Sequence, residues 1–292
     1  MDATTLLITV YCLIDEWLAG RRLRQRGPQP ILADSEVLTI ECVGEFLGID
    51  TDKGLYDHFR RHDRDWFPAL SRVHRTTFVR QAANLWAIKA QLRQQLLTKI
   101  SFDPAISILD SFPMPVCRFG RAYRCRRLAG LAAFGRDEGA KQTFYGVRAH
   151  LRVCWPGVIT DGHLAPANLH DLTVAEDLLA DTSGWALGDR SYWSPARTEL
   201  LADHGVWLLA PPSRSAKRPG PRLPRRLTQA RRRIETVIGQ LVERYHAKRV
   251  WARDAWHLWS RWLRKLLSHT LAVFLCQQTG LGSLRFADLL TT

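Results

Sequence analysis

AISILD, residues 105–110, is a short run of apolar side chains that ends in a carboxylate, Asp110. Pro104 stands directly before it, and a short apolar run bounded in this way predicts a buried β-strand. Residues 185–187 predict a second short strand, which ends in the same manner at Gly188-Asp189. Neighbouring strand ends of an open α/β sheet bring their residues together, so Asp110 and Asp189 are expected to lie close to each other.

The segments around these two strands predict a mixed α/β domain from about residue 101 onward. Further strands are expected at residues 143–153, 157–164 and 206–210, with helices at residues 172–179 and 195–203. Residues 213–233 form a linker-like basic loop with nine Arg or Lys, three Pro and no acid. Two amphipathic helices follow, at residues 231–245 and 252–277. The first has a predicted buried stripe of Ile234, Ile238, Leu241 and Tyr245.

Residues 1–100 predict an all-helical domain. Helices are expected around Leu6, Val10, Leu13 and Trp17, from Asp34 or Ser35 to about Gly48, at residues 54–67 and at residues 76–100. In the last of these, Leu85, Ile88, Leu92 and Leu96 share one face, while Arg80, Lys89, Arg93 and Lys99 are predicted to be exposed. Such a bundle either binds DNA or dimerises, or it only packs as a cap on the next domain. The predicted domains are therefore residues 1–100 and residues 101–292, the second including the basic loop and the C-terminal helices.

Charge points to a polyanionic partner. The chain carries a formal net charge of +14, and its pI is about 10.1. Each Lys or Arg that binds a phosphate releases condensed counterions, so a surplus of this size favours nucleic acid. An anionic membrane surface is the alternative partner. A further alternative is that the basic surface binds no partner and only aids solubility. A hydrophobic content of 46% is enough for a packed core and excludes wholesale disorder.

Cysteine spacing and hydropathy indicate a reduced, soluble protein. The six cysteines are scattered, and none forms a C-x-x-C pair, so a structural zinc site has little support. No signal peptide is recognisable, because Asp15 and Glu16 interrupt the first apolar stretch. No apolar run reaches the length of about 20 residues that spans a bilayer. We therefore expect a cytosolic protein without a membrane anchor.

Three carboxylates on separate elements suggest metal-dependent phosphodiester chemistry. Asp110 and Asp189 follow strands, and Glu235 lies in the first turn of the helix after the basic loop. Such chemistry needs acidic side chains that hold two cations about 4 Å apart. Each acid also has a local alternative: Asp110 could cap the turn at Pro113, Asp189 could form an Asx turn, and Glu235 could pair with Arg231 or Arg232.

Four stretches resemble, in order and spacing, the DDE-type transposases of bacterial insertion sequences. They are residues 108–112 (ILDSF), 166–171 (PANLHD), 186–192 (ALGDRSY) and 232–236 (RRIET). Residues 110–113 (DSFP), 116–118 (VCR), 142–146 (QTFYG) and 234–245 are similar to insertion-sequence family 982 in particular. The likeness covers essentially the whole chain, including the stretch ADSEVLT at residues 33–39.

This resemblance implies a ribonuclease-H-like mixed-sheet catalytic domain preceded by the helical domain. Asp110, Asp189 and Glu235 would be its catalytic and metal-holding residues, with Mg²⁺ as the cofactor and Mn²⁺ as a substitute. The implied activity is cleavage at the ends of a mobile element, followed by transfer of the 3′-hydroxyl into target DNA. Glu243, two turns further along the same helix, is the alternative to Glu235. His170 and Asp171 match the family's motif without an assigned role.

The resemblance also implies partners and a cellular location. The partners would be double-stranded DNA, namely the terminal inverted repeats of the element and the target DNA, and a homo-oligomer would form in the active complex. The location would be the bacterial cytoplasm, in association with the nucleoid. A membrane partner is not expected.

Two basic patches are predicted to bind DNA. Arginine binds phosphate in a bidentate manner, and aromatic rings stack on unpaired bases near a cut. The first patch interleaves Phe119 and Tyr123 with Arg118, Arg121, Arg124, Arg126 and Arg127. The second precedes Glu235 and includes Arg225, Arg226, Arg231 and Arg232. A solvated charged loop is the alternative for both patches, and Trp251, Trp256, Trp259 and Trp262 are predicted to serve the core rather than to stack on bases.

Three other classes of protein share parts of this pattern. A structure-selective nuclease on the same fold would cut DNA without strand transfer. A non-catalytic DNA-binding protein derived from a transposase would bind without cutting, and the three intact acids argue against it. A tyrosine recombinase would need a tyrosine nucleophile, for which Tyr192 and Tyr245 are the candidates.

Overall fold

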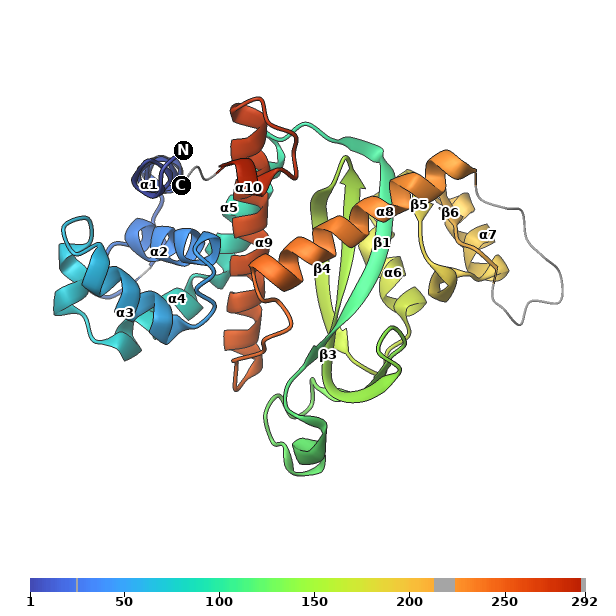
Figure 1. Ribbon diagram of the computed structural model, residues 1–292, viewed down its shortest axis with the longest axis horizontal. Coiled ribbons are helices and arrows are strands. Elements are labelled where there is room, and N and C mark those ends of the chain that lie inside the picture. The colour runs from blue at the N-terminus through green and yellow to red at the C-terminus, as the bar shows by residue number, and fades with distance from the viewer. Residues whose placement is uncertain (25, 213–223, 290–292) are drawn as a thin grey trace. The chain divides into compact units, whose positions relative to one another are not determined.

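The computed structural model describes residues 1–24, 26–212 and 224–289 (Figure 1). Two compact units form within this range. The sheet unit contains the described part of residues 101–240 together with residues 248–250, and the helical unit contains residues 1–100, 241–247 and the described part of 251–292. The C-terminal helices, which were predicted to belong to the domain of residues 101–292, therefore group with the N-terminal helices.

The sheet unit is built on one mixed, six-stranded sheet. Its strands are β1 (Asp103–Pro115), β2 (Ala133–Asp137), β3 (Gln142–Trp155), β4 (Val158–Pro166), β5 (Gly184–Leu187) and β6 (Val206–Leu209). The order is β2-β3-β1-β5-β6, and β4 also pairs with β3. Strand β3 runs antiparallel to β1, β2 and β4, whereas β5 runs parallel to both β1 and β6. The predicted α/β class with helices at its start is confirmed.

Helices cover this sheet. The helices α6 (Asp171–Leu179) and α7 (Pro195–Asp203) share a buried apolar cluster with the sheet, in which Leu109, Ala186 and Leu208 meet Val174 and Leu178. The helix α8 (Arg225–Gly239) contacts β1 and β3 and crosses the sheet over β1 (Figure 1). Ile234 and Val237 are its fully buried residues.

The helical unit packs six helices around α9 (Ala255–Gln278). They are α1 (Ala3–Leu18), α2 (Asp34–Phe46), α3 (Asp52–His62), α4 (Arg75–Asn84), α5 (Trp86–Leu97) and α10 (Phe286–Leu289). Contacts join α9 directly to α2, α4, α5 and α10. No helix among the described residues combines the length and the apolar composition needed to cross a membrane.

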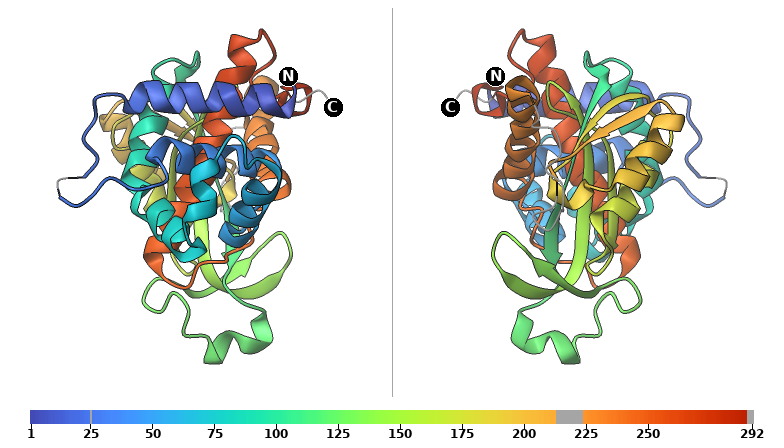
Figure 2. Two further views of the ribbon diagram at one scale, coloured as in Figure 1. Left: turned by 90° about the vertical axis from the view of Figure 1, so that its left-hand side faces the viewer. Right: turned by 90° about the vertical axis from the view of Figure 1, so that its right-hand side faces the viewer.

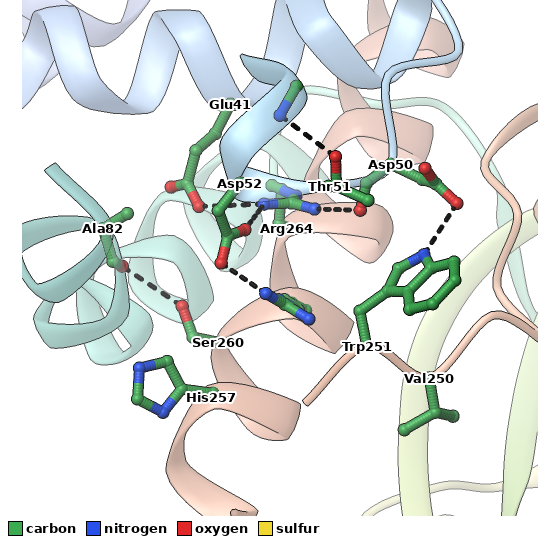
Figure 3. Close-up of polar contacts among 12 residues, drawn as sticks. Glu41, Asp50, Thr51, Asp52, Ala82, Val250, Trp251, His257, Ser260 and Arg264 are labelled. Carbon is green, nitrogen blue, oxygen red and sulfur yellow. Dashed lines mark hydrogen bonds and ion pairs between the residues drawn. The ribbon is translucent and has the colours of Figure 1, made fainter. Parts of the chain in front are cut away.

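A network of buried ion pairs joins α9 to the first helices, and Figure 3 shows its contacts of Arg264 with Glu41 and Asp52. The Arg264 guanidinium on α9 donates to Glu45 at 2.6 Å and to Asp52 at 2.9 Å. The Lys89 ammonium on α5 donates to Glu41 at 2.8 Å and to the Ser260 hydroxyl at 2.8 Å. Charges buried this deeply are tolerated only when they are paired, so each helix in the network depends on the others.

Two predictions of exposure are wrong, one of them for a member of this network, Lys89. Lys89 is 1% exposed and Arg93 is 4% exposed, although their spacing on α5 placed both of them on the solvent side. A helical pattern reports which residues share a face. The pattern does not show that Glu41 of α2 and Ser260 of α9 will cover the polar side of α5.

Several predicted boundaries also shift. The helix expected at residues 76–100 is two helices that meet at Leu85. Strand β1 continues past Asp110 to Pro115 because β3 pairs with it along this whole length, and β2 was not predicted. The helix expected to begin at Arg231 begins at Arg225 and ends at Gly239, where a π-helical turn follows. The rest of the predicted basic loop, residues 213–223, lies outside the described residues.

The tryptophan predictions are correct only in part. Trp262 is 1% exposed and belongs to the core, whereas Trp251 and Trp256 are exposed to 50% and 39%. The N-cap of α2 is Ala33 rather than Asp34 or Ser35, because the Glu36 carboxylate accepts from the Ala33 N–H and Asp34 pairs with Arg24.

Candidate active site

The register of two parallel strands positions Asp110 and Asp189. Ile108 of β1 pairs with Leu187 of β5 at the end of their shared ladder. Each aspartate follows its paired residue by two positions, and Asp189 keeps an extended backbone. The β5–β6 hydrogen bonding also continues one residue further, since Gly188 N–H donates to the Leu209 carbonyl at 3.0 Å. The two carboxylates therefore lie at the same level of the sheet, Asp110 within β1 and Asp189 just past the end of β5.

Strand alternation shows which face the two aspartates occupy. Leu109 and Ala186 belong to the apolar cluster under α6 and α7. Side chains of successive strand residues point to opposite faces, so Ile108, Asp110 and Leu187 lie on the other face. That face is the one that α8 crosses: the positive charge of Arg231 on α8 acts on Asp110.

Local hydrogen bonds hold one oxygen of each carboxylate. The Ser111 N–H donates to Asp110 Oδ1 at 2.8 Å. The Ser191 N–H and hydroxyl donate to Asp189 Oδ1 at 2.8 Å and 2.5 Å. The Asx turn considered for Asp189 is thus present. Within the ranges that the structure describes, Oδ2 of either aspartate forms no hydrogen bond, so each carboxylate retains one oxygen for a ligand.

Asp110 is held in a place that resists its ionisation. Burial raises the pKa of its carboxyl to about 7, and the charges of Asp189 and Asp171 act in the same direction. The Ser111 N–H and the Arg231 guanidinium lower this pKa in part. A carboxylate that is desolvated beside like charges gains from an added cation.

The chemistry of this donor set suits a hard divalent cation. Carboxylate oxygens are the ligands that Mg²⁺ prefers, and they are also the ligands of Mn²⁺. Two aspartates form only part of a coordination shell. In the described part of the chain, no three His, Cys, Asp or Glu side chains are grouped so as to hold a metal ion. A third oxygen would have to come from a side chain that moves, from DNA or from water.

Glu235 lies on α8 one helical turn after Arg231. Its side chain is 58% exposed, and one of its oxygens lies 3.7 Å from Arg231 Nη2. The ion pair considered for Glu235 is therefore present at long range. Since Arg231 also acts on Asp110, Glu235 is carried by the helix that covers the aspartates. Its assignment as the third catalytic acid stays a prediction.

A polar cluster on the face of the sheet that α6 covers includes Asp171, whose role the sequence left open. The Ser111 hydroxyl donates to Asp171 Oδ1 at 2.8 Å, and His150 Nδ1 lies 3.6 Å from the same oxygen. The Arg148 guanidinium lies 3.9 Å from Asp171 and donates to the Ser111 hydroxyl at 3.3 Å. His150 is fully buried, and burial lowers its pKa to about 4, so the ring is neutral. The only sequence signal for this cluster was the PANLHD stretch.

Both candidate tyrosine nucleophiles are inaccessible. Tyr192 and Tyr245 are 0% exposed, and burial raises the pKa of both hydroxyls. A recombinase tyrosine must reach a phosphodiester and lose its proton. Neither Tyr192 nor Tyr245 can do so from its buried position. Neither residue is therefore a candidate nucleophile for a tyrosine recombinase.

The first basic patch follows β1 and contains the short 3₁₀ helix η2 (Phe119–Arg124). It lies at one end of the sheet, beside the curled hairpin of β2 and β3 (Figure 2). Its exposed arginines are Arg118, Arg121, Arg124 and Arg126. Arg127 differs from them, because its guanidinium donates to the carbonyls of Val116 at 3.2 Å and Val250 at 2.9 Å. Arg127 therefore fixes the segment, and the other four remain the predicted phosphate ligands.

The second basic patch is helical rather than a loop. Arg225, Arg226 and Arg232 are exposed on α8, and Arg231 is half-buried near Asp110. Arg233 stacks on the Trp155 ring at 5.3 Å and so contributes to packing. Part of the predicted loop is therefore helical, and of its arginines Arg231 acts on Asp110.

Comparison with known proteins gives two matches. The family model of the transposase DDE domain matches residues 101–250. The cryo-EM structure of the piggyBac transposase synaptic complex with hairpin DNA is similar to this chain, with a TM-score of 0.51 and 9% sequence identity. The similarity covers 99% of this chain and 79% of the piggyBac chain, and it shows a shared fold. None of the curated proteins matches the chain.

Proposed function

Because this chain belongs to the family of the transposase DDE domain, we propose that it is a DNA transposase with Asp110, Asp189 and Glu235 as its catalytic residues. The observation that supports this most is the parallel register of Ile108 with Leu187. It supports a site in which Asp110, within β1, and Asp189, just past the end of β5, lie at the same level of the sheet, each with one unengaged oxygen. The helix α8 carries the third acid.

The proposal extends to the kind of fold and the kind of element. In the sheet, β3 pairs antiparallel with β1, β2 and β4, and two later strands, β5 and β6, run parallel to β1. This order supports a ribonuclease-H-like catalytic unit. The stretches DSFP and QTFYG support insertion-sequence family 982 within the DDE transposases.

The proposed reaction has two steps. In the first, water attacks a phosphorus at the end of the element, the bond to the 3′ oxygen breaks, and a free 3′-hydroxyl remains. In the second, this hydroxyl attacks a phosphorus of target DNA and displaces another 3′ oxygen, so one phosphodiester replaces another. Neither step requires a covalent bond between enzyme and DNA.

The residues of the chain supply position and charge for this reaction. Bound Mg²⁺, or Mn²⁺ in its place, would polarise the phosphate and lower the pKa of the attacking group. Asp110 and Asp189 would hold that metal through Oδ2, while the Ser111 and Ser191 amides keep each carboxylate oriented. Arg231 would balance the negative charge of the phosphate near Asp110.

The partners proposed are the inverted repeats at the element's ends, target DNA and further copies of this chain. A protein of similar fold, the piggyBac transposase, was solved in a synaptic complex with hairpin DNA. The exposed arginines of the two basic patches support a DNA partner here. A bacterial cytoplasmic location near the nucleoid belongs to the same proposal.

To test this function, the purified protein is incubated with Mg²⁺ and with DNA that carries the inverted repeats flanking its gene. The cut strands, and any joining to plasmid DNA, are then mapped. We expect cutting and joining with the unaltered chain. Asp110→Asn and Asp189→Asn should each abolish both, and Asp181→Asn, an exposed acid of the same unit, should change neither. Cutting without joining would indicate a nuclease instead, and binding without metal-dependent nicking would indicate a non-catalytic DNA-binding protein.

A further inference from the structure

We propose that Phe119, Tyr123 and Phe134 form a stacking platform for unpaired DNA bases, beside arginines that bind the adjoining phosphates. This inference rests on the proposed function, since it specifies which part of a DNA substrate the chain engages. We call these three residues the aromatic platform. Two of them lie in η2, and the third lies on β2, a strand that the sequence did not predict.

The three rings lie against one another at the end of the sheet. The centroids of Tyr123 and Phe134 are 5.1 Å apart with ring planes 36° from parallel. Phe119 contacts both rings edge-on, with centroids 6.5 Å from each. Tyr145 supports the group from below, because it is the cross-strand partner of Phe134 and its ring centroid lies 5.2 Å away.

The platform is exposed to an extent that folding alone does not explain. Phe119, Tyr123 and Phe134 are exposed to 48%, 83% and 38%. Tyr123 in particular keeps most of its surface open to solvent although its ring lies against that of Phe134. An exposed group of large apolar side chains next to charged residues is typical of a binding site.

The backbone under the rings is fixed. The Val116 N–H donates to the Tyr145 carbonyl at 2.9 Å, and the Cys125 N–H donates to the Ala122 carbonyl at 3.1 Å. Ala122 is 3% exposed, so η2 is anchored between its two exposed rings. Together with the two carbonyl bonds of Arg127, these contacts hold the rings in place before a ligand arrives. Preorganisation of this kind lowers the entropic cost of binding.

Charge identifies the ligand. A cavity of about 890 Å³ adjoins Tyr123 and is lined mainly by Arg121, Arg124, Arg126 and Arg127. Arg118 is also exposed, next to Phe119. Aromatic rings among guanidinium groups are the combination that binds single-stranded nucleic acid, in which rings stack on bases and cations bind phosphates.

The geometry favours unpaired bases over intact duplex. A base offers its flat face to a protein ring only when it is unstacked or terminal. A duplex in its interior offers phosphates and base edges, which the arginines alone can bind. A DNA end that is frayed, flipped or single-stranded therefore gains contacts here that a closed duplex does not.

Binding to three DNA ligands of equal phosphate count tests the platform. They are a blunt duplex, a duplex with a four-nucleotide single-stranded end, and the same duplex whose single-stranded end is abasic. We expect the natural single-stranded end to bind more tightly than the other two. Tyr123→Ala should reduce that preference by roughly 5- to 100-fold, which corresponds to the loss of one stacked base.

Matched variants separate stacking from other effects. Tyr123→Phe keeps the ring and should keep the preference. Trp207→Ala removes an exposed aromatic residue of the same unit, one that pairs with Trp185 away from the arginines, and should leave binding unchanged. A 2-aminopurine base in the single-stranded end should be quenched by the unaltered chain and not by Tyr123→Ala.

Three outcomes would overturn the platform: equal binding of the natural and abasic ends, an unchanged preference in Tyr123→Ala, or a change in the oligomeric state of Tyr123→Ala without a change in affinity. The last would identify the platform as a protein contact. These failures are distinguishable from failure of the proposed function, because cutting and joining at Asp110 and Asp189 are measured separately. A non-catalytic DNA-binding protein could still show the base preference.

Discussion

Asp110 and Asp189 occupy equivalent positions on two parallel strands, each two residues past the last pair of the β1–β5 ladder, Ile108 with Leu187. Each carboxylate accepts a hydrogen bond at Oδ1 from the backbone N–H of a serine that follows it closely in the chain. Burial raises the pKa of the Asp110 carboxyl to about 7, and the charge of Asp189 acts in the same direction.

Asp110→Asn should stabilise the metal-free protein above neutral pH. The Asp110 carboxyl has a higher pKa in the folded than in the unfolded chain, so the folded state binds more protons between about pH 4 and pH 7. Its contribution to the free energy of unfolding therefore falls as pH rises through this window. We expect Asp110→Asn to be more stable than the unaltered chain by about 1–3 kcal/mol at pH 8, and the difference to shrink toward pH 4.

Chemical denaturation at several pH values measures this difference. Adding Mg²⁺ at pH 8 should then raise the melting temperature of the unaltered chain and leave that of Asp110→Asn nearly unchanged. A difference that stays constant between pH 4 and pH 8 would mean that Asp110 ionises normally.

Glu235→Gln should abolish cutting without unfolding the protein. The substitution keeps size and helix propensity, and α8 remains packed through Ile234 and Val237. Loss of a metal ligand removes several kcal/mol of transition-state stabilisation, so cleavage should fall by orders of magnitude while end binding persists.

Glu243→Gln is the matched control for this change. Glu243 is exposed and lies beyond the end of α8, two turns or about 12 Å along a regular helix. We expect it to reduce cutting only slightly. Loss of cutting in Glu243→Gln with normal cutting in Glu235→Gln would reassign the third acid.

Asp171 and Ser111 should act on catalysis as one unit. The Ser111 hydroxyl donates to Asp171, and the Ser111 N–H donates to Asp110, so Asp171 orients Asp110 through Ser111. We expect Asp171→Asn and Ser111→Ala each to lower cutting about 10- to 100-fold, as changes in supporting residues of metal ligands do.

The double variant separates this positioning role from two independent defects. If both residues act through one path, Asp171→Asn with Ser111→Ala should be little worse than either single change. Both should also raise the Mg²⁺ concentration that gives half-maximal cutting. Independent, multiplying losses would show that Asp171 acts elsewhere.

The exposed arginines of the first basic patch should contribute DNA affinity that is independent of sequence. Changing Arg121, Arg124 and Arg126 to Ala should weaken binding to any duplex and reduce the salt slope by up to about three phosphate contacts. Arg127→Ala should instead lower the melting temperature, because its guanidinium binds the carbonyls of Val116 and Val250. Binding titrations at several salt concentrations check both expectations, and an unchanged slope in the triple variant would exclude this patch from the DNA interface.

Lys89→Met should destabilise the helical unit strongly. It leaves the Glu41 carboxylate, which is 2% exposed, without its closest cation. Breaking a buried pair from one side costs about 3–5 kcal/mol, whereas Lys99→Met at an exposed position should cost less than about 0.5 kcal/mol. Denaturant unfolding of the two variants measures this contrast. Similar stabilities would mean that Arg264 alone neutralises Glu41.

The sequence by itself determined the local elements that carry the chemistry. Apolar runs that end in Asp110 and Asp189 were readable as strands, because strand formation depends on a few neighbouring side chains. The helical start and the order of strands and helices in residues 143–210 followed in the same way. The short motifs around the acids also indicated the family, since residues that contact reacting groups are constrained in type and spacing.

Only the tertiary structure decided what depends on residues far apart in the chain. The parallel pairing of Ile108 with Leu187 sets the two aspartates side by side, and no local pattern specifies a register between strands about 80 residues apart. The same holds for Lys89, whose burial depends on Glu41 and Ser260, and for Phe134, which joins the aromatic platform through its pairing with Tyr145. Local propensity determines an element, whereas its partner, and therefore the environment of each side chain, is chosen by packing across the fold.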